Sequence, residues 1–406
     1  MSRLAERYDV AIAGGGMIGA SLALALAATE LRVLLVEAVS AESAVQPSFD
    51  DRTTALGNGA RAIFDTLGVW PAIHARAGEI RAIHVSDAGH FGFTRLEASA
   101  FGQQAFGFTV SNRHLGAVLW GALRAAQRIS LASPARVTGV ELAAEEATLR
   151  IAEQGMAERT VTAALVVAAD GAHSLVKQVA GIDSSTSDYG QVALIANLKT
   201  DRAAQGVAFE RFTATGPIAL LPLIGNSYAL VWTLAPAAAG AMQQCEPGEF
   251  CQRLQASFGW RAGRIVEVGT RAAYPLQLIR AEQATGVRVA LIGNAAQALH
   301  PIAAQGFNLG LRDVAVLAEL VARAPDPGAP ALLAEFAQRR SADRRGMIGF
   351  TDRLVKLFGD PGAGAIVARN LGLLLLDVLP PAKRALSRLS FGFGGQLPRL
   401  VRGLPL

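Results

Sequence analysis

Cysteine is scarce in this chain of 406 residues, which contains only Cys245 and Cys251. The spacing of these two cysteines matches no common metal-binding pattern, and no metal site is expected. Two thiols cannot cross-link a chain of this length into a disulfide-stabilised scaffold. A reducing compartment, the cytoplasm, is therefore the expected location.

Lysine and charge are also scarce. Charged residues make up 17% of the chain and apolar residues 51%, which excludes a disordered or fibrous protein. No block of basic residues interleaved with aromatics occurs, so no nucleic-acid partner is expected. The formal net charge of +5 fits anionic cofactors or an anionic membrane surface. The only lysines are Lys177, Lys199, Lys356 and Lys383.

A glycine-rich turn between two apolar runs is the clearest motif. Residues 10–13 read as a buried parallel strand, and residues 33–36 read as a second strand that ends at Glu37. Between them, the G-x-G-x-x-G turn consists of Gly14, Gly16 and Gly19. Such glycines permit a tight turn, let a pyrophosphate approach the backbone, and let the next helix pack on the strand. With free N–H groups at the helix start and an acid for a ribose, this unit predicts dinucleotide binding.

Two other interpretations of this segment fail. Residues 10–29 carry no charge and are long enough to span a bilayer, and Arg3 and Arg7 before them imitate a secretion signal. Three consecutive glycines, however, stand where a membrane helix needs its strongest helix formers. Glu6 and Asp9 also interrupt the basic leader.

Two arginines are candidates for anion binding. Arg52 precedes a predicted helix at residues 57–67 and can hold a phosphate by bidentate hydrogen bonds, with a surface salt bridge as the alternative. Arg113 lies in the first turn of another predicted helix, where the helix dipole disfavours a cation. That position favours a ligand for Arg113.

The middle of the chain predicts a second sheet. Residues 161–169 read as a buried strand that ends at Asp170 and Gly171, where either a ligand contact or an ordinary turn fits the local sequence. Residues 80–96 read as a hairpin outside the first unit. From residue 191 the sequence is rich in strands, interrupted by a helix at residues 247–258. This region predicts a layer that covers a substrate.

Near residue 287 the chain is expected to return to the first domain. A strand and a polar loop lead into a long helix from about Phe307, whose first N–H groups are suited to an anionic ring edge. From residue 331 the chain is mostly helical and ends in an apolar tail that contains arginines. This tail is expected to cap the core, with contact to a membrane surface as the alternative.

The order of these motifs resembles a known family. The glycine turn, Asp-Gly at residue 170 and G-N-A-A…H-P…Q-G from residue 293 are similar to the single-component flavin monooxygenases built like para-hydroxybenzoate hydroxylase. Finer phrases resemble the ubiquinone-biosynthesis hydroxylases in that group, and GNAA with the tail NLGLLLLDVLPPAKRAL is most similar to the branch acting on 2-octaprenyl-6-methoxyphenol. These phrases are FDDRTTAL (49–56), DYGQVALIAN (188–197), ERFTATGPIALLPL (210–223), LVWT (230–233) and LIGNAAQALHPIAAQGFNLGLRDV (291–314).

The resemblance implies an α/β fold. A Rossmann-like FAD-binding domain is expected, with an inserted mixed β-sheet substrate domain and a helical C-terminal region. The implied FAD-binding domain comprises residues 1–78, 105–185 and 280–325. The substrate domain would comprise residues 79–104 and 186–279, and the helical cap residues 326–406.

The resemblance also implies a set of site residues. In it the glycine turn holds the FAD pyrophosphate, Glu37 holds the adenosine ribose, and the flavin pyrimidine is lined by Gln305, Gly306 and Asn308. Val137 would meet adenine through its backbone, and Asn294 takes the place of the more common aspartate near the ribityl chain. The implied FAD-binding residues are Gly14, Gly16, Ile18, Gly19, Glu37, Arg52, Arg113, Val137, Asp170, Gly171, Gly293, Asn294, Gln305, Gly306, Phe307 and Asn308. The implied catalytic residues are His300, Pro301 and Gln305.

The implied reaction uses NAD(P)H and O2 to hydroxylate a polyprenylated phenol. His300 would accept or relay the phenolic proton, with a loop-anchoring hydrogen bond as the alternative. Other ubiquinone-biosynthesis proteins are the expected partners. Two rivals are a flavin-binding subunit without turnover and a prenyl reductase of the same fold. An apolar channel or ordinary core is expected for Phe209, Phe212, Leu221 and Trp232.

Two residues depart from the family pattern. Ala304 stands where glycine usually precedes Gln-Gly, and Lys177 stands where arginine usually follows D-G-x-x-S. Neither change removes a catalytic group, so activity is expected to be retained. Both changes bear instead on the detailed conformation of their loops.

Overall fold

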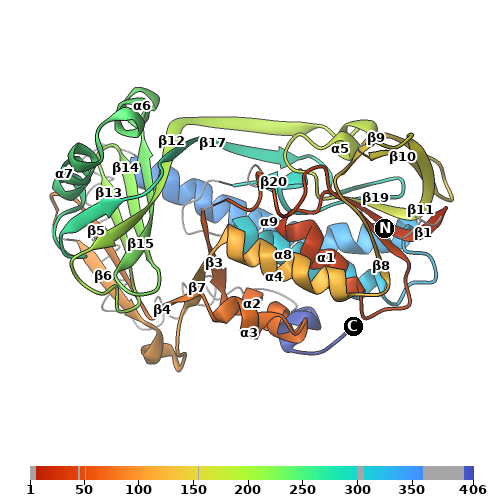
Figure 1. Cartoon of the computed structure of the whole chain (residues 1–406), viewed down its shortest axis with the longest axis horizontal. Coiled ribbons are helices and arrows are strands. Elements are labelled where there is room, and N and C mark those ends of the chain that lie inside the picture. The colour runs from red at the N-terminus through yellow and green to blue at the C-terminus, as the bar shows by residue number, and fades with distance from the viewer. Residues whose placement is uncertain are drawn as a thin grey trace.

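The computed structural model describes residues 6–43, 46–50, 52–90, 92–153, 155–299, 306–359 and 397–406. One half of the molecule is built on an eight-stranded sheet, right of centre in Figure 1, with the order β18-β19-β11-β1-β2-β8 and with β10 and β9 attached beside β11. Strands β1, β2, β8, β11 and β19 run parallel. The strands of this sheet are β1 (Arg7–Ala13), β2 (Val33–Val36), β8 (Ile129–Ala132), β9 (Ala135–Leu142), β10 (Ala147–Glu153), β11 (Arg159–Ala168), β18 (Thr285–Gly286) and β19 (Val289–Leu291).

The other half is built on a nine-stranded sheet with the order β20-β17-β12-β15-β14-β13-β5-β6, and β16 pairs with β12. Its strands are β5 (Ala82–Asp87), β6 (Phe93–Glu97), β12 (Ser184–Thr200), β13 (Val207–Thr213), β14 (Gly216–Pro222), β15 (Ser227–Leu234), β16 (Ile265–Val268), β17 (Ala272–Ala281) and β20 (Gln297–Ala298). A three-stranded sheet of β3 (Thr53–Gly57), β7 (Gly107–Ser111) and β4 (Gly78–Ile80) lies between the two halves.

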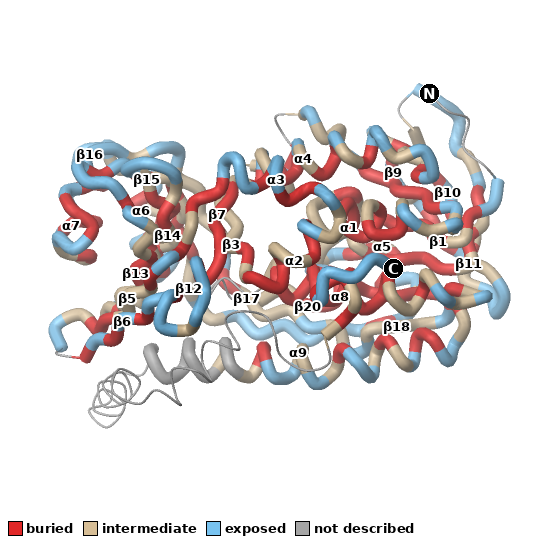
Figure 2. Tube along the Cα trace, turned by 90° about the horizontal axis from the view of Figure 1, so that it is seen from below, coloured by how far each residue is buried: buried red, intermediate tan, exposed pale blue. Residues whose placement is uncertain are grey.

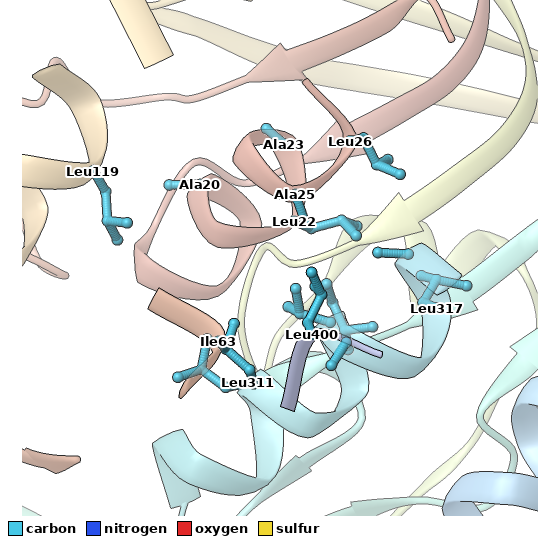
Figure 3. Close-up of a cluster of buried hydrophobic side chains, with 14 of the residues drawn as sticks. Ala20, Leu22, Ala23, Ala25, Leu26, Ile63, Leu119, Leu311, Leu317 and Leu400 are labelled. Carbon is cyan, nitrogen blue, oxygen red and sulfur yellow. The ribbon is translucent and has the colours of Figure 1, made fainter. Parts of the chain in front are cut away.

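Helix α1 forms the centre of the larger core because it is apolar on every side. Its sequence MIGASLALAL buries seven of ten residues, as expected for a helix without a polar face. Side chains from other elements lie around it in Figure 3, including Leu119, Leu311 and Leu400. The helices near this core are α1 (Met17–Leu26), α2 (Asn58–Thr66), α3 (Trp70–His74), α4 (Asn112–Ala125), α8 (Gly306–Val321) and α9 (Pro330–Gly359), with the short turns η2 (Gly293–Ala295) and η4 (Leu400–Arg402).

The two faces of the nine-stranded sheet have different neighbours. Helices α6 (Pro236–Gln244) and α7 (Pro247–Phe258) cover one face, on the side of the sheet away from α1 and α8. The opposite face is turned toward the eight-stranded half, and we call it the inner face. Because side chains alternate along a strand, the inner face of β13, β14 and β15 includes Ala208, Glu210, Phe212, Ala219, Leu221 and Val231.

Strand β12 joins the two halves of the molecule. It begins beside α5 (Leu175–Val179) and runs across the top of Figure 1, paired with β17, into the nine-stranded sheet. The register with β17 shifts between Asp188 and Val192, at Gly190, whose φ of +65° suits glycine. In Figure 2, buried segments lie inside both halves, while the exposed ones lie on the outer helices and turns.

Most sequence-based elements are confirmed. The hairpin expected at residues 80–96 is β5 and β6, and the helix expected at 247–258 is α7. The segment tested as a membrane span is strand β1, the glycine turn and helix α1. In the part of the chain that the structure describes, no helix is both long and apolar enough to cross a membrane. The expected α/β fold with an inserted sheet is confirmed, while the domain boundaries stay predictions.

The apolar tail is described only in part. Residues 360–396 lie outside the described part of the chain. In the last ten residues, Leu400 and Val401 are buried in the larger core, and the carbonyl oxygen of Leu400 accepts a hydrogen bond from Thr66 Oγ1 at 3.1 Å. The last ten residues therefore pack against α2, and the helical cap over the core stays a prediction. A membrane contact of the apolar tail stays a prediction.

Candidate functional site

The predicted cofactor motifs meet at one edge of the eight-stranded sheet. The glycine turn follows β1, Glu37 follows β2, Asp170 follows β11 and Gly293 follows β19. These four strands are parallel and adjacent in the order β19-β11-β1-β2, so their carboxyl ends share an edge. Three strand spacings separate the two ends of this row, about 14 Å. The edge lies at a place where open α/β sheets bind ligands.

Gly14 and Gly19 allow a close approach that no larger residue permits. Gly14 has a φ of +101°, and a Cβ atom there would lie 2.5 Å from the carbonyl oxygen of Ala169. A Cβ atom on Gly19 would overlap the carbonyl oxygen of Gly14. The turn is therefore closely packed between helix α1 and the end of β11. This geometry gives the first and third glycines of the motif the roles that the sequence predicts.

Glu37 is held against the glycine turn by three donors. Its Oε2 accepts a hydrogen bond from the Gly15 N–H at 2.6 Å, and its Oε1 accepts from the Val39 N–H at 2.9 Å and from Gln46 Nε2 at 3.1 Å. The Nε1–H of Trp120 donates to the carbonyl oxygen of Gly15 at 2.9 Å. A carboxylate has about four lone-pair positions, so one acceptor position of Glu37 is left for a ribose hydroxyl.

The start of α1 fits a pyrophosphate. Gly16 is the N-cap residue, and no described side chain accepts a hydrogen bond from the first turn of the helix. That turn also contains no acidic residue. A Cβ atom on Gly16 would lie 2.8 Å from Ser48 Oγ, so only glycine leaves this approach open. These residues fit the adenine nucleotide half of FAD.

Ile18 connects the glycine turn to the second cofactor motif. A Cβ atom on Gly293 would lie 3.1 Å from the Ile18 side chain, and one on Gly310 would lie 2.8 Å from it. Ile18 thus packs between the turn after β19 and helix α8. Asn294 is exposed beside this contact. The predicted residues Ile18, Gly293 and Asn294 are therefore close together, although a contact with FAD stays a prediction.

A buried ion network holds the turn after β19. Asp313 on α8 is fully buried and pairs with Arg340 at 2.7 Å and with Arg344 at 3.1 Å, both on α9. Asp313 Oδ2 also accepts hydrogen bonds from the Gly293 N–H at 3.3 Å and from Gln297 Nε2 at 3.1 Å. Burial alone would raise the pKa of the Asp313 carboxyl, but Arg344 and Arg340 outweigh burial and hold that pKa below its usual value. The network fixes three elements around one carboxylate.

The start of α8 is tied to β3. Asn308 Nδ2 donates to the carbonyl oxygen of Ala55 at 2.8 Å, and its Oδ1 accepts from the Gly57 N–H at 2.9 Å. The ring of Phe307 stacks on Phe64 with 6.4 Å between ring centres. The amide of Asn308 thus positions β3, and its predicted contact with the flavin ring would add to this role. No described atom lies within 4 Å of a Cβ atom added to Gly306, so the helix start is open among the described residues.

The other predicted residues have varied surroundings. Arg52 pairs with Asp50 at 2.5 Å and lies over the ring of Tyr274 at 4.8 Å, so it forms the salt bridge that was the alternative to phosphate binding. Arg113 is exposed at the start of α4, and Val137 is half-buried on β9. Asp170 Oδ2 accepts a hydrogen bond from the Leu175 N–H at 3.0 Å. Their contacts with FAD remain predictions.

The Asp-Gly turn is open, and the channel candidates divide between two faces of a sheet. Gly171 has a φ of +91°, and no neighbour in the described part of the chain lies within 4 Å of an added Cβ atom. Of the four channel candidates, Phe209 and Trp232 lie in the core under α7, where their rings contact Phe258 and Phe250 at 5.6 and 6.0 Å. Phe212 and Leu221 lie on the inner face instead.

The predicted catalytic residues lie outside the described part of the chain. His300, Pro301 and Gln305 belong to residues 300–305, as does the unusual Ala304. Sequence reasoning also missed Trp120, Gln46 and the Asp313 network. Asp313 stands within the matching phrase at residues 291–314, so its position was available as a signal. Trp120 and Gln46 gave none, because only the fold brings them to Gly15 and Glu37.

Comparisons with known proteins identify the family of this chain. The FAD binding domain family model matches residues 7–351. The chain is 37% identical to the ubiquinone hydroxylase UbiL of Rhodospirillum rubrum, over 98% of this chain and 93% of the relative. It is 29% identical to the 3-demethoxyubiquinol 3-hydroxylase of Escherichia coli, over 95% of this chain and 98% of the relative.

Solved structures share the fold. The p-nitrophenol 4-monooxygenase PnpA from Pseudomonas putida has a TM-score of 0.78 at 17% identity, covering 97% of this chain and all of that one. The OxyS anhydrotetracycline hydroxylase from Streptomyces rimosus has a TM-score of 0.74 at 23% identity, covering 97% of this chain and 77% of that one. The chain therefore belongs to the FAD binding domain family and is an FAD-dependent monooxygenase in the group of the ubiquinone hydroxylases.

Proposed function

We propose that this protein hydroxylates the aromatic ring of a polyprenylated phenol in ubiquinone biosynthesis, with NAD(P)H and O2 as co-substrates. The observation that carries the proposal is the 37% identity to a ubiquinone hydroxylase along nearly the whole of both chains. The specific substrate we propose is 2-octaprenyl-6-methoxyphenol. The phrase GNAA at residue 293 supports that choice.

Bound FAD supplies the redox chemistry and the activation of O2. The residues of this chain bind and orient it. The N–H groups at the start of α1 would hold the pyrophosphate, Glu37 would accept a hydrogen bond from a ribose hydroxyl, and the N–H groups at the start of α8 would stabilise negative charge on the flavin. The Asp313 network keeps α8 and the turn at Gly293 in fixed relation. The inner face of the nine-stranded sheet covers the reacting ring and excludes water.

The test uses the purified protein. We expect a yellow protein with one FAD per chain, whose oxidation of NAD(P)H accelerates when a prenylated methoxyphenol is added. With ¹⁸O₂ the product should contain one labelled oxygen. A flavin that NAD(P)H never reduces would support a non-catalytic binding subunit, and turnover without ¹⁸O in the product would support a reductase.

A second candidate is hydroxylation at another ring position of the same pathway. The relative named 3-demethoxyubiquinol 3-hydroxylase, similar over 95% of this chain, favours it. Quinone intermediates in a strain that lacks this protein would distinguish the two. Accumulation of 2-octaprenyl-6-methoxyphenol supports the first proposal, and accumulation of a later intermediate supports the second. We also propose a cytoplasmic location with peripheral contact to the membrane that contains the substrate, alongside other proteins of the pathway.

A further inference from the structure

One carboxylate, that of Glu210, lies among apolar neighbours on the inner face. Glu210 on β13 is paired by register with Val85 on β5 and with Ala219 on β14. Along its own strand the neighbours on the same face are Ala208 and Phe212. None of these four side chains can donate a hydrogen bond to a carboxylate. The environment of Glu210 is thus apolar on every side within the sheet.

Glu210 has no partner among the residues that the structure describes. Neither carboxyl oxygen takes part in a hydrogen bond or an ion pair with them. Burial raises the pKa of the Glu210 carboxyl to about 7. Another titratable group on the same face is Asp87, which lies across from Phe212 and contacts His90 at 3.4 Å. Glu210 is half-buried, and an unpaired carboxylate beside apolar neighbours is unfavourable unless something else uses it.

The inner face around Glu210 lies against the cofactor half. Ala208, one pleat from Glu210 and about 7 Å along the strand, belongs to the apolar cluster against which Ala55 of β3 packs. The carbonyl oxygen of Ala55 accepts the hydrogen bond from Asn308 at the start of α8. At the other side of the sheet, Tyr274 lies under the guanidinium of Arg52. Ala208, Ala55 and Asn308 thus connect the strand of Glu210 to the start of α8, where we propose that the flavin ring binds.

This placement matches the needs of a phenol. A ring that is covered by an apolar surface still carries a hydroxyl group, which needs an acceptor. Deprotonation of that hydroxyl group makes the ring electron-rich, as hydroxylation requires. We propose that Glu210 accepts the proton of the substrate's phenolic hydroxyl. This inference rests on the proposed function, because it assumes a phenol between the inner face and the cofactor.

The step is a proton transfer without redox change. The phenol O–H bond breaks, a carboxyl O–H bond forms on Glu210, and the electron pair stays on the phenolate oxygen. An ordinary glutamate, with a pKa near 4.3, would ionise only about one in a million phenols of pKa near 10. At a pKa of about 7 the fraction rises to about one in a thousand. When the product leaves, Glu210 releases its proton to solvent.

The first experiment compares Glu210→Gln with the control Glu97→Gln, which changes an exposed glutamate of β6 that pairs with Arg95. We expect Glu210→Gln to retain FAD and its reduction by NAD(P)H, while hydroxylation of the prenylated methoxyphenol falls at least 100-fold. The rise of the wild-type rate with pH near 7 should vanish in this variant. Wild-type hydroxylation and an unchanged pH profile in Glu210→Gln would overturn the proposal.

The second experiment does not depend on turnover and uses 4-nitrophenol as a probe. The complex of phenolate with protonated Glu210 contains one proton that the ionised free partners lack. The affinity of the wild-type protein for the phenolate should therefore fall about tenfold per pH unit above pH 8. Affinity in Glu210→Gln should not change with pH, and Glu210→Asp should retain the dependence if the amide variant does not fold. Equal pH dependence in wild type and Glu210→Gln, or none in wild type, overturns the assignment. If the probe behaves as expected but no prenylphenol is hydroxylated, the proposed function fails and the role of Glu210 stands.

Discussion

Two glycines with the same backbone requirement have different surroundings. Gly14 and Gly171 both have positive φ angles, +101° and +91°. Of the two, only Gly14 has neighbouring atoms, among the described residues, in the space that a Cβ atom would occupy. We expect Gly171→Ala to lower the free energy of unfolding by about 1–3 kcal/mol, which is the typical cost of the backbone conformation alone. Gly14→Ala should lower it further and abolish FAD binding. Urea unfolding and flavin content would measure both, and equal losses in the two variants would contradict the close packing on Ala169.

The hydrogen bond from Trp120 is a second residue-scale test. Trp120→Phe removes the donor and leaves the buried carbonyl oxygen of Gly15 unpaired, which should lower the free energy of unfolding by about 1–3 kcal/mol. The matched control is Trp260→Phe, because Trp260 is 67% exposed and its indole reaches solvent. Thermal and urea unfolding of both variants would measure the difference. Similar values for the two would show that the Gly15 contact is not a source of stability.

At this scale the sequence predicted which residues matter but not their partners. The spacing of the glycines and Glu37 followed from known chemistry of dinucleotide binding. Trp120 is far from Gly15 in the sequence, and Gln46 belongs to no motif. Only the fold brings Trp120 to Gly15 and Gln46 to Glu37. Glu210 stood inside a phrase that resembled the family, yet its face of the strand could be assigned only after Phe209 was seen to pack under α7.

At the scale of elements, α9 is attached to α8 through charge. Asp313→Asn leaves Arg340 and Arg344 without their shared buried partner, and breaking such a pair typically lowers the free energy of unfolding by about 3–5 kcal/mol. The control is Glu335→Gln, which removes an exposed pair with Arg339 at i,i+4 and should change stability by less than about 0.5 kcal/mol. Denaturant unfolding at pH 7 would compare them.

The pH dependence of this effect has a definite sign. The pKa of Asp313 is lower in the folded state than in the unfolded state, so its stabilisation is fully present above about pH 4. It is lost as pH falls through the lowered pKa of the folded protein. The difference in unfolding free energy between wild type and Asp313→Asn should therefore shrink in acid. A difference that is constant from pH 7 to pH 3 would contradict the ion network.

The helices and strands were easier to predict than the way in which they pair with one another. The helix at residues 247–258 begins with proline and ends before glycine, and both signals are local. By contrast, β12 pairs with β15, β16 and β17, and no local pattern specifies such partners. The buried pairing of α8 with α9 was missed for the same reason. Periodicity identifies a helix but does not tell which of its charges lie inside.

At the scale of the whole molecule, the two faces of the nine-stranded sheet differ in what they contact. Phe209 packs under α7, and truncation to alanine should lower the free energy of unfolding by about 3 kcal/mol. Val231 is on the inner face and only half-buried, so Val231→Ala should change stability by about 1 kcal/mol or less. On the proposed function, it should instead alter the KM for prenylphenols. Unfolding and steady-state kinetics of both variants would measure this, and a reversed pattern would contradict the assignment of the two faces.

Alternation along β13, β14 and β15 has a consequence for how such proteins diversify. Every second residue of these strands packs under α6 and α7. The residues between them face the other half of the molecule, where the proposed substrate would bind. Mutations can therefore accumulate at the half-buried positions of the second set, such as Val231, while the first set stays constant. Laboratory evolution confined to that second set should yield new ring selectivities from folded, flavin-loaded progeny.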